Sequence, residues 1–146
     1  MPKGKISFKL SNRLSELETL NKKIDKFSVQ AGIPNKCIFE INLVLEELFS
    51  NITCYGYRDD KDHWIHVSMS CENDVMTIQI KDDGIPFNPL DLEKPHLFCD
   101  LEDRDIGGLG IHLVKHYIKE CVYERRGNKN ILILKKTIGS DLSDPK

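Results

Sequence analysis

The stretch NKCIFEINLVLEELFSNITCY, residues 35–55, carries the clearest helical pattern of the chain. Its apolar residues recur every three or four positions, which is typical of a helix that packs one face on a core. They are Ile38, Ile41, Leu45, Leu48, Phe49 and Ile52. Gly56 follows and ends the pattern, since glycine commonly closes a helix. We therefore expect one long amphipathic helix here.

The residues before this helix predict a strand and a further helix. Residues 5–10 alternate polar and apolar side chains with period two, as a half-buried strand does. From 13 to 31 the apolar residues again recur at three and four, and Gly32 and Pro34 stop the run. The N-terminal part is therefore predicted as strand, helix, helix.

Beyond residue 56 the pattern changes to short alternating segments that are typical of strands in hairpins. The predicted strands are 63–70, 75–81, 121–126 and 130–138. A stretch without period, 84–106, separates the two hairpins, and a helix is predicted over 111–118. Together the elements predict an α+β fold, a two-layer α/β sandwich. Its mixed, mostly antiparallel sheet is expected to be covered on one face by three helices.

Length and composition favour one domain. The 146 residues, 40% of them hydrophobic, suit a single core. We expect the domain to span residues 1–139 and residues 140–146 to form a solvated tail. The charges nearly cancel, with 21 basic against 23 acidic residues, so the composition gives no sign of a nucleic-acid or anionic-membrane partner.

The cysteines and the apolar runs indicate a cytoplasmic protein. The cysteines are Cys37, Cys54, Cys71, Cys99 and Cys121. They are widely spread and form no Cys-x-x-Cys pair, which favours free thiols in a reducing cytosol over a disulfide framework. No apolar run approaches the length of about twenty residues that a membrane-spanning helix needs, and residues 1–10 lack the apolar core of a secretion signal.

Two polar residues of the long predicted helix could serve one ligand. Each helical residue turns about 100°, so Glu47 and Asn51 lie about 40° apart on one side of the helix. The amide oxygen of Asn51 suits Mg²⁺, which usually keeps phosphate oxygens and waters as its other ligands. The carboxylate of Glu47 could accept a proton from an attacking hydroxyl or water. The alternative is a solvated polar face.

Asp82 and Gly84 follow a predicted strand at a sharp turn. A carboxylate at a strand end can accept a hydrogen bond from an exocyclic amine such as that of adenine, and glycine lets the backbone approach the ring closely. The alternative is a plain Asp-Asp-Gly turn. Further on, Gly107, Gly108 and Gly110 open a predicted helix, where backbone amides can face phosphate oxygens. A flexible hinge is the alternative for these glycines.

The three motifs together resemble the N, G1 and G2 boxes of the GHKL-type ATPase superfamily, which is shared by gyrase, histidine kinases, mismatch-repair proteins and anti-sigma-factor kinases. The segments that carry the resemblance are 47–51, 82–89 and 106–114. They look most like those of stand-alone anti-sigma-factor serine/threonine kinases. The resemblance implies a Bergerat-type fold with an ATP lid at about 87–106.

The same resemblance implies roles for individual residues. Glu47 matches the general base, Asn51 the Mg²⁺ ligand and Asp82 the adenine-binding carboxylate. Positions implied to contact the nucleotide also include Gly84, Arg104, Gly107, Gly108, Leu109 and Gly110. Three positions depart from the pattern. Pro86 replaces a glycine, Ile106 stands where some relatives have an arginine, so that phosphate contact would pass to Arg104, and Asn130-Ile131 lacks a threonine that often helps to hold adenine.

A serine/threonine protein kinase that uses ATP and Mg²⁺ is the function that the resemblance implies. Such kinases hold a sigma factor off RNA polymerase and phosphorylate a small antagonist protein, so that partners exchange, and similar proteins commonly form homodimers. No direct contact with nucleic acid or membrane is expected. Two alternatives stay open: a regulatory module that binds ATP without phosphotransfer, and the detached catalytic domain of a two-component histidine kinase.

Overall fold

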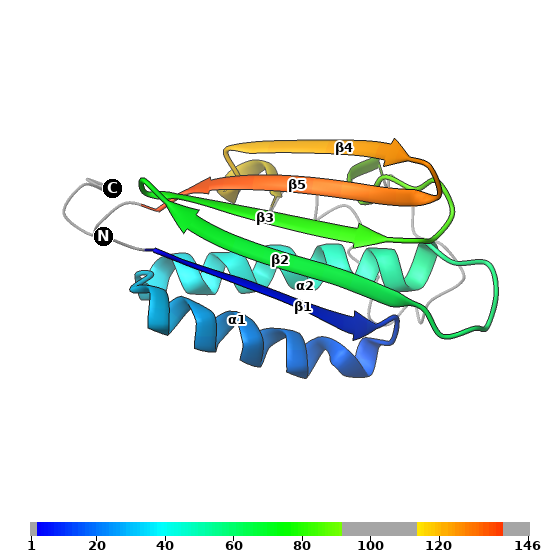
Figure 1. Ribbon diagram of the computed structural model, residues 1–146, viewed down its shortest axis with the longest axis horizontal. Helices are drawn as coiled ribbons and strands as arrows, with labels where there is room; N and C mark the ends of the chain where they lie inside the picture. The colour runs from blue at the N-terminus through cyan, green and yellow to red at the C-terminus, as the bar shows by residue number, and fades with distance from the viewer. Residues whose placement is uncertain (1–2, 92–113, 139–146) are drawn as a thin grey trace.

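The computed structural model describes residues 3–91 and 114–138, and within them the chain forms two layers. One layer is an antiparallel sheet with the strand order β1-β2-β3-β5-β4 (Figure 1). Its strands are β1 (Gly4–Ser11), β2 (Trp64–Glu72), β3 (Val75–Asp82), β4 (Glu120–Arg126) and β5 (Lys129–Thr137). The other layer contains α1 (Leu17–Ala31), α2 (Asn35–Tyr55) and the helical residues 114–117. Short 3₁₀ turns lie at Leu14–Glu16 and Pro89–Asp91.

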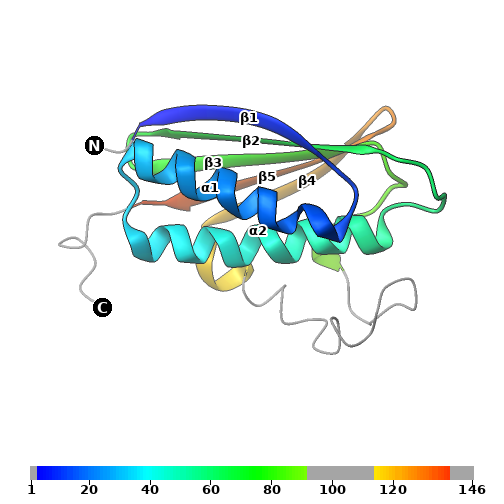
Figure 2. The same ribbon diagram turned by 90° about the horizontal axis from the view of Figure 1, so that it is seen from below.

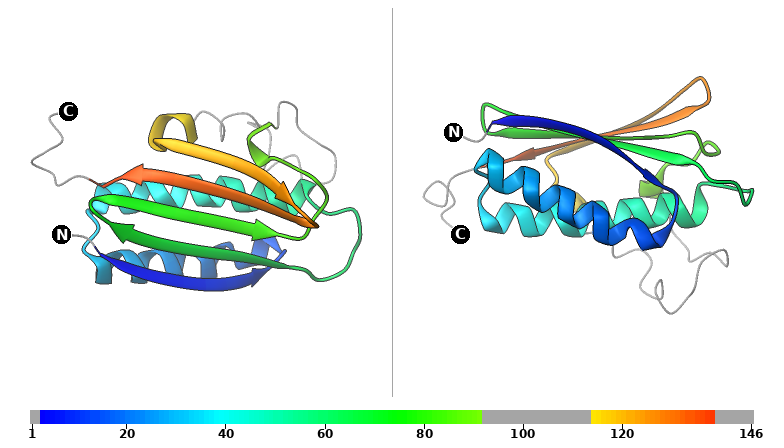
Figure 3. Two further views of the ribbon diagram at one scale, coloured as in Figure 1. Left: turned by 45° about the horizontal axis from the view of Figure 1, so that its top comes forward. Right: turned by 60° about the horizontal axis from the view of Figure 1, so that its bottom comes forward.

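The helices cover one face of the sheet and leave the other face open. Figure 2 shows α1 and α2 side by side beneath the sheet, and Figure 3 shows the open face. Alternate strand residues such as Ile78 and Leu134 point toward the helices and are fully buried. They pack against the apolar stripe of α2, where Ile41 and Val44 are equally inaccessible. The period-two and period-3.6 patterns of the sequence therefore meet in one core.

Turn residues set the connections between these elements. Gly32 ends α1 in the left-handed conformation with φ 79°, which glycine adopts without steric cost. Asn73 and Asp74, with φ 54° and 64°, join β2 to β3 in a tight hairpin that needs positive φ at both positions. The hairpin β4–β5 turns at Gly127, where φ is 63°.

A buried ion pair ties the end of the helical residues 114–117 to both layers. Nζ of Lys136, on β5, donates to Oε1 of Glu40 on α2 at 2.6 Å and to the carbonyl oxygen of Tyr117 at 3.0 Å. The side chains of Lys136 and Glu40 are 6% and 11% exposed. Because a buried charge is costly without its partner, this pair fixes one arrangement of the three segments.

The predicted fold class is confirmed, and every strand pair of the described sheet is antiparallel. The long helix has the predicted bounds, whereas the helix expected over 13–31 is split into a 3₁₀ turn and α1. Of the helix expected over 111–118, the first three residues lie outside the described range, as do most of the expected lid and tail. No helix among the residues in view is long and apolar enough to cross a membrane.

Among the cysteines of the described residues, the expectation of free thiols is wrong at Cys54. Cys37, Cys71 and Cys121 are free thiols, while Cys54 is disulfide-bonded. Wide spacing along the sequence does not prevent two cysteines from meeting in the fold, because pairing depends on the distance between their Cα atoms in space.

Candidate functional site

The C-terminal half of α2 carries the first two predicted site residues. Asn51 is only 2% exposed, and Glu47, one turn earlier, is partly buried. The alternative of a solvated polar face is therefore wrong at Asn51, whereas Glu47 is still partly exposed. Burying a polar amide is costly unless it is hydrogen-bonded, so a place for Asn51 inside the protein needs a polar environment.

Asp82 is the last residue of β3 and is 3% exposed. Its Oδ1 accepts hydrogen bonds from the backbone N of Gly84 at 2.8 Å and from Nδ2 of Asn130 at 2.9 Å. Burial raises the pKa of this carboxyl, and the two hydrogen bonds only partly oppose that shift. Within the described part of the chain, Oδ2 makes no hydrogen bond. One oxygen of Asp82 is thus held by two protein donors, whereas no described donor holds the other.

Gly84 brings the turn after β3 against the end of α2. A Cβ at Gly84 would lie 2.2 Å from the carbonyl oxygen of Gly56, far inside van der Waals contact. The same oxygen accepts a hydrogen bond from the backbone N of Ile85 at 2.8 Å. From the sequence pattern, Gly84 is expected to allow close approach of a nucleotide ring. In the structure, the protein backbone itself already requires glycine at this position. The contact places Asp82 and α2 next to one another.

Asn130 is the residue that the sequence argument undervalued. It was treated as a missing threonine, yet it pairs with Asp82 across β3 and β5 and is 3% exposed. Its Nδ2 donates to Asp82 and to the carbonyl oxygen of Ile85 at 2.7 Å. Its Oδ1 accepts from the hydroxyl of Tyr123 at 2.5 Å, from Nη1 of Arg125 at 3.1 Å and from the backbone N of Phe87 at 3.3 Å.

These bonds make Asn130 the centre of a network, which we call the Asn130 hub and define by Asn130, Tyr123 and Arg125. Arg125 adds a hydrogen bond from Nη1 to the carbonyl oxygen of Gly84 at 2.8 Å. Donors gather at the amide oxygen and acceptors at the amide nitrogen, so only one orientation of the amide satisfies them. The hub therefore orients both Asp82 and the turn that follows it.

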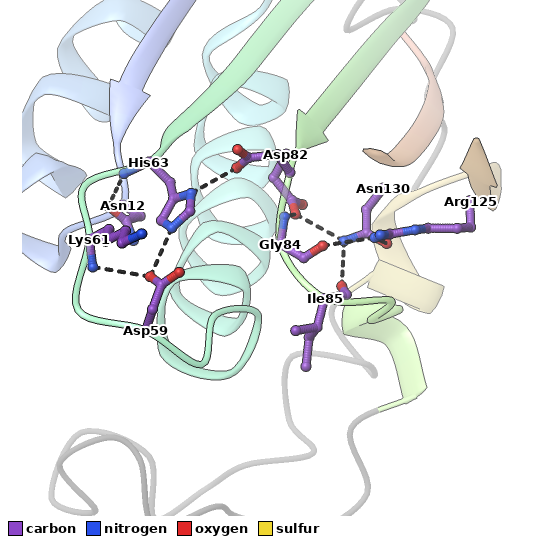
Figure 4. Close-up of polar contacts among 10 residues, drawn as sticks. Asn12, Asp59, Lys61, His63, Asp82, Gly84, Ile85, Arg125 and Asn130 are labelled. Carbon is purple, nitrogen blue, oxygen red and sulfur yellow. Dashed lines mark hydrogen bonds and ion pairs between the residues drawn. The ribbon is translucent and has the colours of Figure 1, made fainter. Parts of the chain in front are cut away.

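A second cluster holds the other side of the same turn. In Figure 4, His63 and Asn130 lie on opposite sides of Gly84. Nδ1 of His63 lies 3.1 Å from Oδ1 of Asp83, and Nε2 lies 2.9 Å from Oδ1 of Asp59. The imidazole stacks on Tyr57 with ring centroids 4.4 Å apart. The sequence argument did not single out His63, since nothing in the local pattern links residue 63 to residue 83.

The remaining predicted nucleotide contacts lie outside the described residues. They are Arg104, Gly107, Gly108, Leu109 and Gly110, together with Ile106 and all but the start of the expected lid at 87–106. The structure therefore places Asp82 and Gly84 beside the C-terminal end of α2, the helix that carries Glu47 and Asn51, and the glycine-rich motif stays a prediction.

Comparisons with known proteins indicate the family of this chain. The family model described as "Histidine kinase-like ATPase domain" matches residues 10–136. The chain is 27% identical over 96 residues to the serine/threonine-protein kinase BtrW of Bordetella bronchiseptica, covering 66% of this chain and 68% of that protein. It is 27% identical over 100 residues to an anti-sigma F factor of Geobacillus sp. (strain WCH70), covering 68% of each.

A solved structure shows the same fold at low sequence identity. It contains the RsbU and RsbW domains of Rv1364c from Mycobacterium tuberculosis, and it superimposes with a TM-score of 0.66 at 11% identity. The alignment covers 92% of this chain and 32% of that longer chain. The fold, the polar residues at the end of α2 and β3, and the extent of the family match lead to one conclusion. The chain belongs to the family of histidine kinase-like ATPase domains.

Proposed function

We propose that the protein is a Mg²⁺-dependent serine/threonine protein kinase that acts as an anti-sigma factor. One observation carries the ATP site: the buried carboxylate of Asp82, with one oxygen fixed by protein donors and the other unpaired among the described residues. It lies beside the helix that bears Glu47 and Asn51. A carboxylate oxygen that no described protein donor occupies suits a ligand with a complementary donor, such as the amine of adenine.

Each residue then has a distinct task. Oδ2 of Asp82 accepts a hydrogen bond from the base, and Gly84 keeps the turn close to α2. The amide oxygen of Asn51 is a suitable ligand for Mg²⁺, which neutralises phosphate charge when it is bound. Glu47 accepts the proton of the attacking serine or threonine hydroxyl.

The partners in this proposal come from the names of the relatives. A serine/threonine-protein kinase and an anti-sigma F factor are among the proteins that the chain resembles. We infer a sigma factor as one partner and a small antagonist protein as the phosphorylated one, in a cytoplasmic partner-switching circuit. We also infer that the protein forms a homodimer and makes no direct contact with nucleic acid or membrane.

Calorimetric titration with ATP, with and without Mg²⁺, tests the site. The wild-type chain is expected to bind ATP more tightly with Mg²⁺, and Asp82→Asn is expected to bind at least about 100-fold more weakly because an amide NH₂ would face the amine of the base. Asp74→Asn is a matched control, since Asp74 lies in the turn before β3, at the far end of that strand. Equal ATP binding by wild type and Asp82→Asn would sink the proposal.

Glu47→Gln separates a kinase from a module that only binds ATP. This substitution keeps the size of the side chain and removes its basicity. We expect ATP affinity to stay within about twofold while transfer of the γ-phosphate to the antagonist falls about 100-fold or more. If the wild-type chain binds Mg²⁺-ATP but turns over none in the presence of the antagonist, the regulatory module is the better description.

A further inference from the structure

The loop between α2 and β2 ends at His63, which joins two carboxylates from different parts of the chain. Asp59 belongs to this loop, and Asp83 belongs to the turn after β3. Both ring nitrogens of His63 lie within hydrogen-bond distance of a carboxylate oxygen. We call His63, Asp59 and Asp83 the histidine clamp.

The geometry of the clamp assigns its protonation state. A neutral imidazole has one N–H donor and one lone pair, so it can donate to only one of two carboxylates. The other nitrogen would then face a carboxylate oxygen at about 3 Å, lone pair against lone pair. Only the imidazolium donates at both nitrogens, and its single positive charge offsets part of the charge of the two acids.

The surroundings keep the ring in this place. The side chain of His63 is 17% exposed. Its backbone N donates to Oδ1 of Asn12 at 3.0 Å, which ties the loop to the end of β1. Partial burial opposes the charged ring, but the hydrogen bonds to Asp59 and Asp83 outweigh it, so the pKa of His63 is raised.

The charged and titratable groups around the clamp come from several elements. A cavity of about 410 Å³ beside it is lined by Tyr57, Arg58, Asp59, His63, Asp83 and Arg125, together with the turn 84–86. Tyr57 stacks on the ring and stays neutral, because burial and the nearby carboxylates raise its pKa. Among the described residues, the two carboxylates are the acceptors of the ring's hydrogen bonds.

We propose that His63 is a positioning residue whose protonated ring holds Asp83, and through it Asp82, in the geometry that binds the adenine of ATP. The inference rests on the proposed ATP site. Asp83 adjoins Asp82 in sequence, and its negative charge contributes to the raised pKa of Asp82. Loss of the proton from His63 frees Asp83 and leaves its charge unbalanced beside the base-binding carboxylate, so ATP binding weakens as the pH rises.

The test is the dissociation constant of Mg²⁺-ATP at pH 6, 7, 8 and 9 for three forms of the full chain. Between pH 6 and pH 9 the dissociation constant of wild type is expected to rise by about fivefold more than that of His63→Gln, whose side chain does not titrate. His66→Gln is the matched control, because His66 lies in β2, three residues after His63, on the open face, where burial and three lysines lower its pKa against a smaller opposing effect of Asp83. Ionisation of ATP itself affects all three forms equally.

Asp83→Asn and an NMR titration of the His63 ring distinguish the clamp from a direct attraction between His63 and ATP. In the nucleotide-free chain, Asp83→Asn should lower the pKa of His63, and in the binding assay it should remove the extra pH dependence. If Asp83→Asn keeps that dependence, or if His63→Gln follows the wild-type profile, the clamp does not position the site. Absence of ATP binding at every pH would instead defeat the proposed function, and the inference with it.

Discussion

The two sides of the turn after β3 are held in different ways. On one side, the side chain of Asn130 is buried and makes five hydrogen bonds, of which the one to Asp82 is fully buried and the other four are partly buried. On the other side, the partly exposed ring of His63 makes two hydrogen bonds, both to carboxylates, and it can donate both only when it is protonated. The Asn130 side can hold one geometry at any ordinary pH, whereas the His63 side loses hydrogen bonding when the ring loses its proton. A site that is both precise and adjustable needs both kinds of support.

The largest effect is expected at the centre of the turn. Gly84→Ala would place a methyl group 2.2 Å from the carbonyl oxygen of Gly56, and backbone atoms cannot rotate away as a side chain can. We expect the free energy of unfolding to fall by about 3 kcal/mol, measured by urea denaturation. Gly127→Ala, in open space at φ 63°, should cost only about 1 kcal/mol. Similar costs for the two variants would contradict the tight contact.

Asn130→Ala tests the Asn130 side and should rank second. It removes the partner of several polar groups, including Asp82 and the hydroxyl of Tyr123, and leaves them unsatisfied. We expect a loss of about 2 kcal/mol in unfolding free energy and weaker ATP binding at every pH. Asn128→Ala, at the exposed hairpin turn, is the control. A stable Asn130→Ala that binds ATP normally would show that the hub is dispensable.

Asp82→Asn should separate stability from function. Since burial raises the pKa of Asp82, its ionised form is less favourable in the folded than in the unfolded chain, so it destabilises the native state above the unfolded pKa near 3.8. The amide keeps the acceptor for Gly84 and Asn130 without the charge. We expect Asp82→Asn to raise the Tm at pH 7, a gain that disappears below about pH 4. A lower Tm at pH 7 would mean that the carboxylate stabilises the fold.

The His63 side should give the smallest effect on stability. The folded pKa of His63 is raised above the unfolded value of 6.5, so its contribution is fully present below that pH and is lost as the pH rises through the folded pKa. Wild type should exceed His63→Gln in unfolding free energy by up to about 1 kcal/mol at pH 6, and the two should converge by pH 9. A constant difference across this range would indicate packing against Tyr57 instead of charge.

Local patterns predicted most of the fold because periodicity is a property of neighbours along the chain. The bounds of α2 follow from one apolar stripe and a closing glycine, and the hairpin β2–β3 follows from Asn73-Asp74. The positions of Glu47, Asn51 and Asp82 on these elements were predicted in the same way. Their roles in ATP binding and transfer stay predictions until the titrations above are made.

The sequence could not predict which polar groups meet across the sheet. The absence of a threonine near residue 130 predicted a weaker site. The contact between Asn130 and Asp82 could not be foreseen, because it joins residues 48 positions apart and depends on β5 lying beside β3. The same holds for His63 and Asp83, 20 positions apart on either side of a hairpin. The burial of Asn51 also depends on what covers its helix face, which the helical period alone does not state.

The sequence by itself determined the elements, their order and the residue types at the site, because each of these depends on the spacing of side chains along a few turns or strands. Only the tertiary structure decided that Asp82 is oriented from Asn130 on one side and from the histidine clamp on the other. Sheet order and register bring those groups within 3.1 Å of their partners, and hydrogen bonds act only at that range.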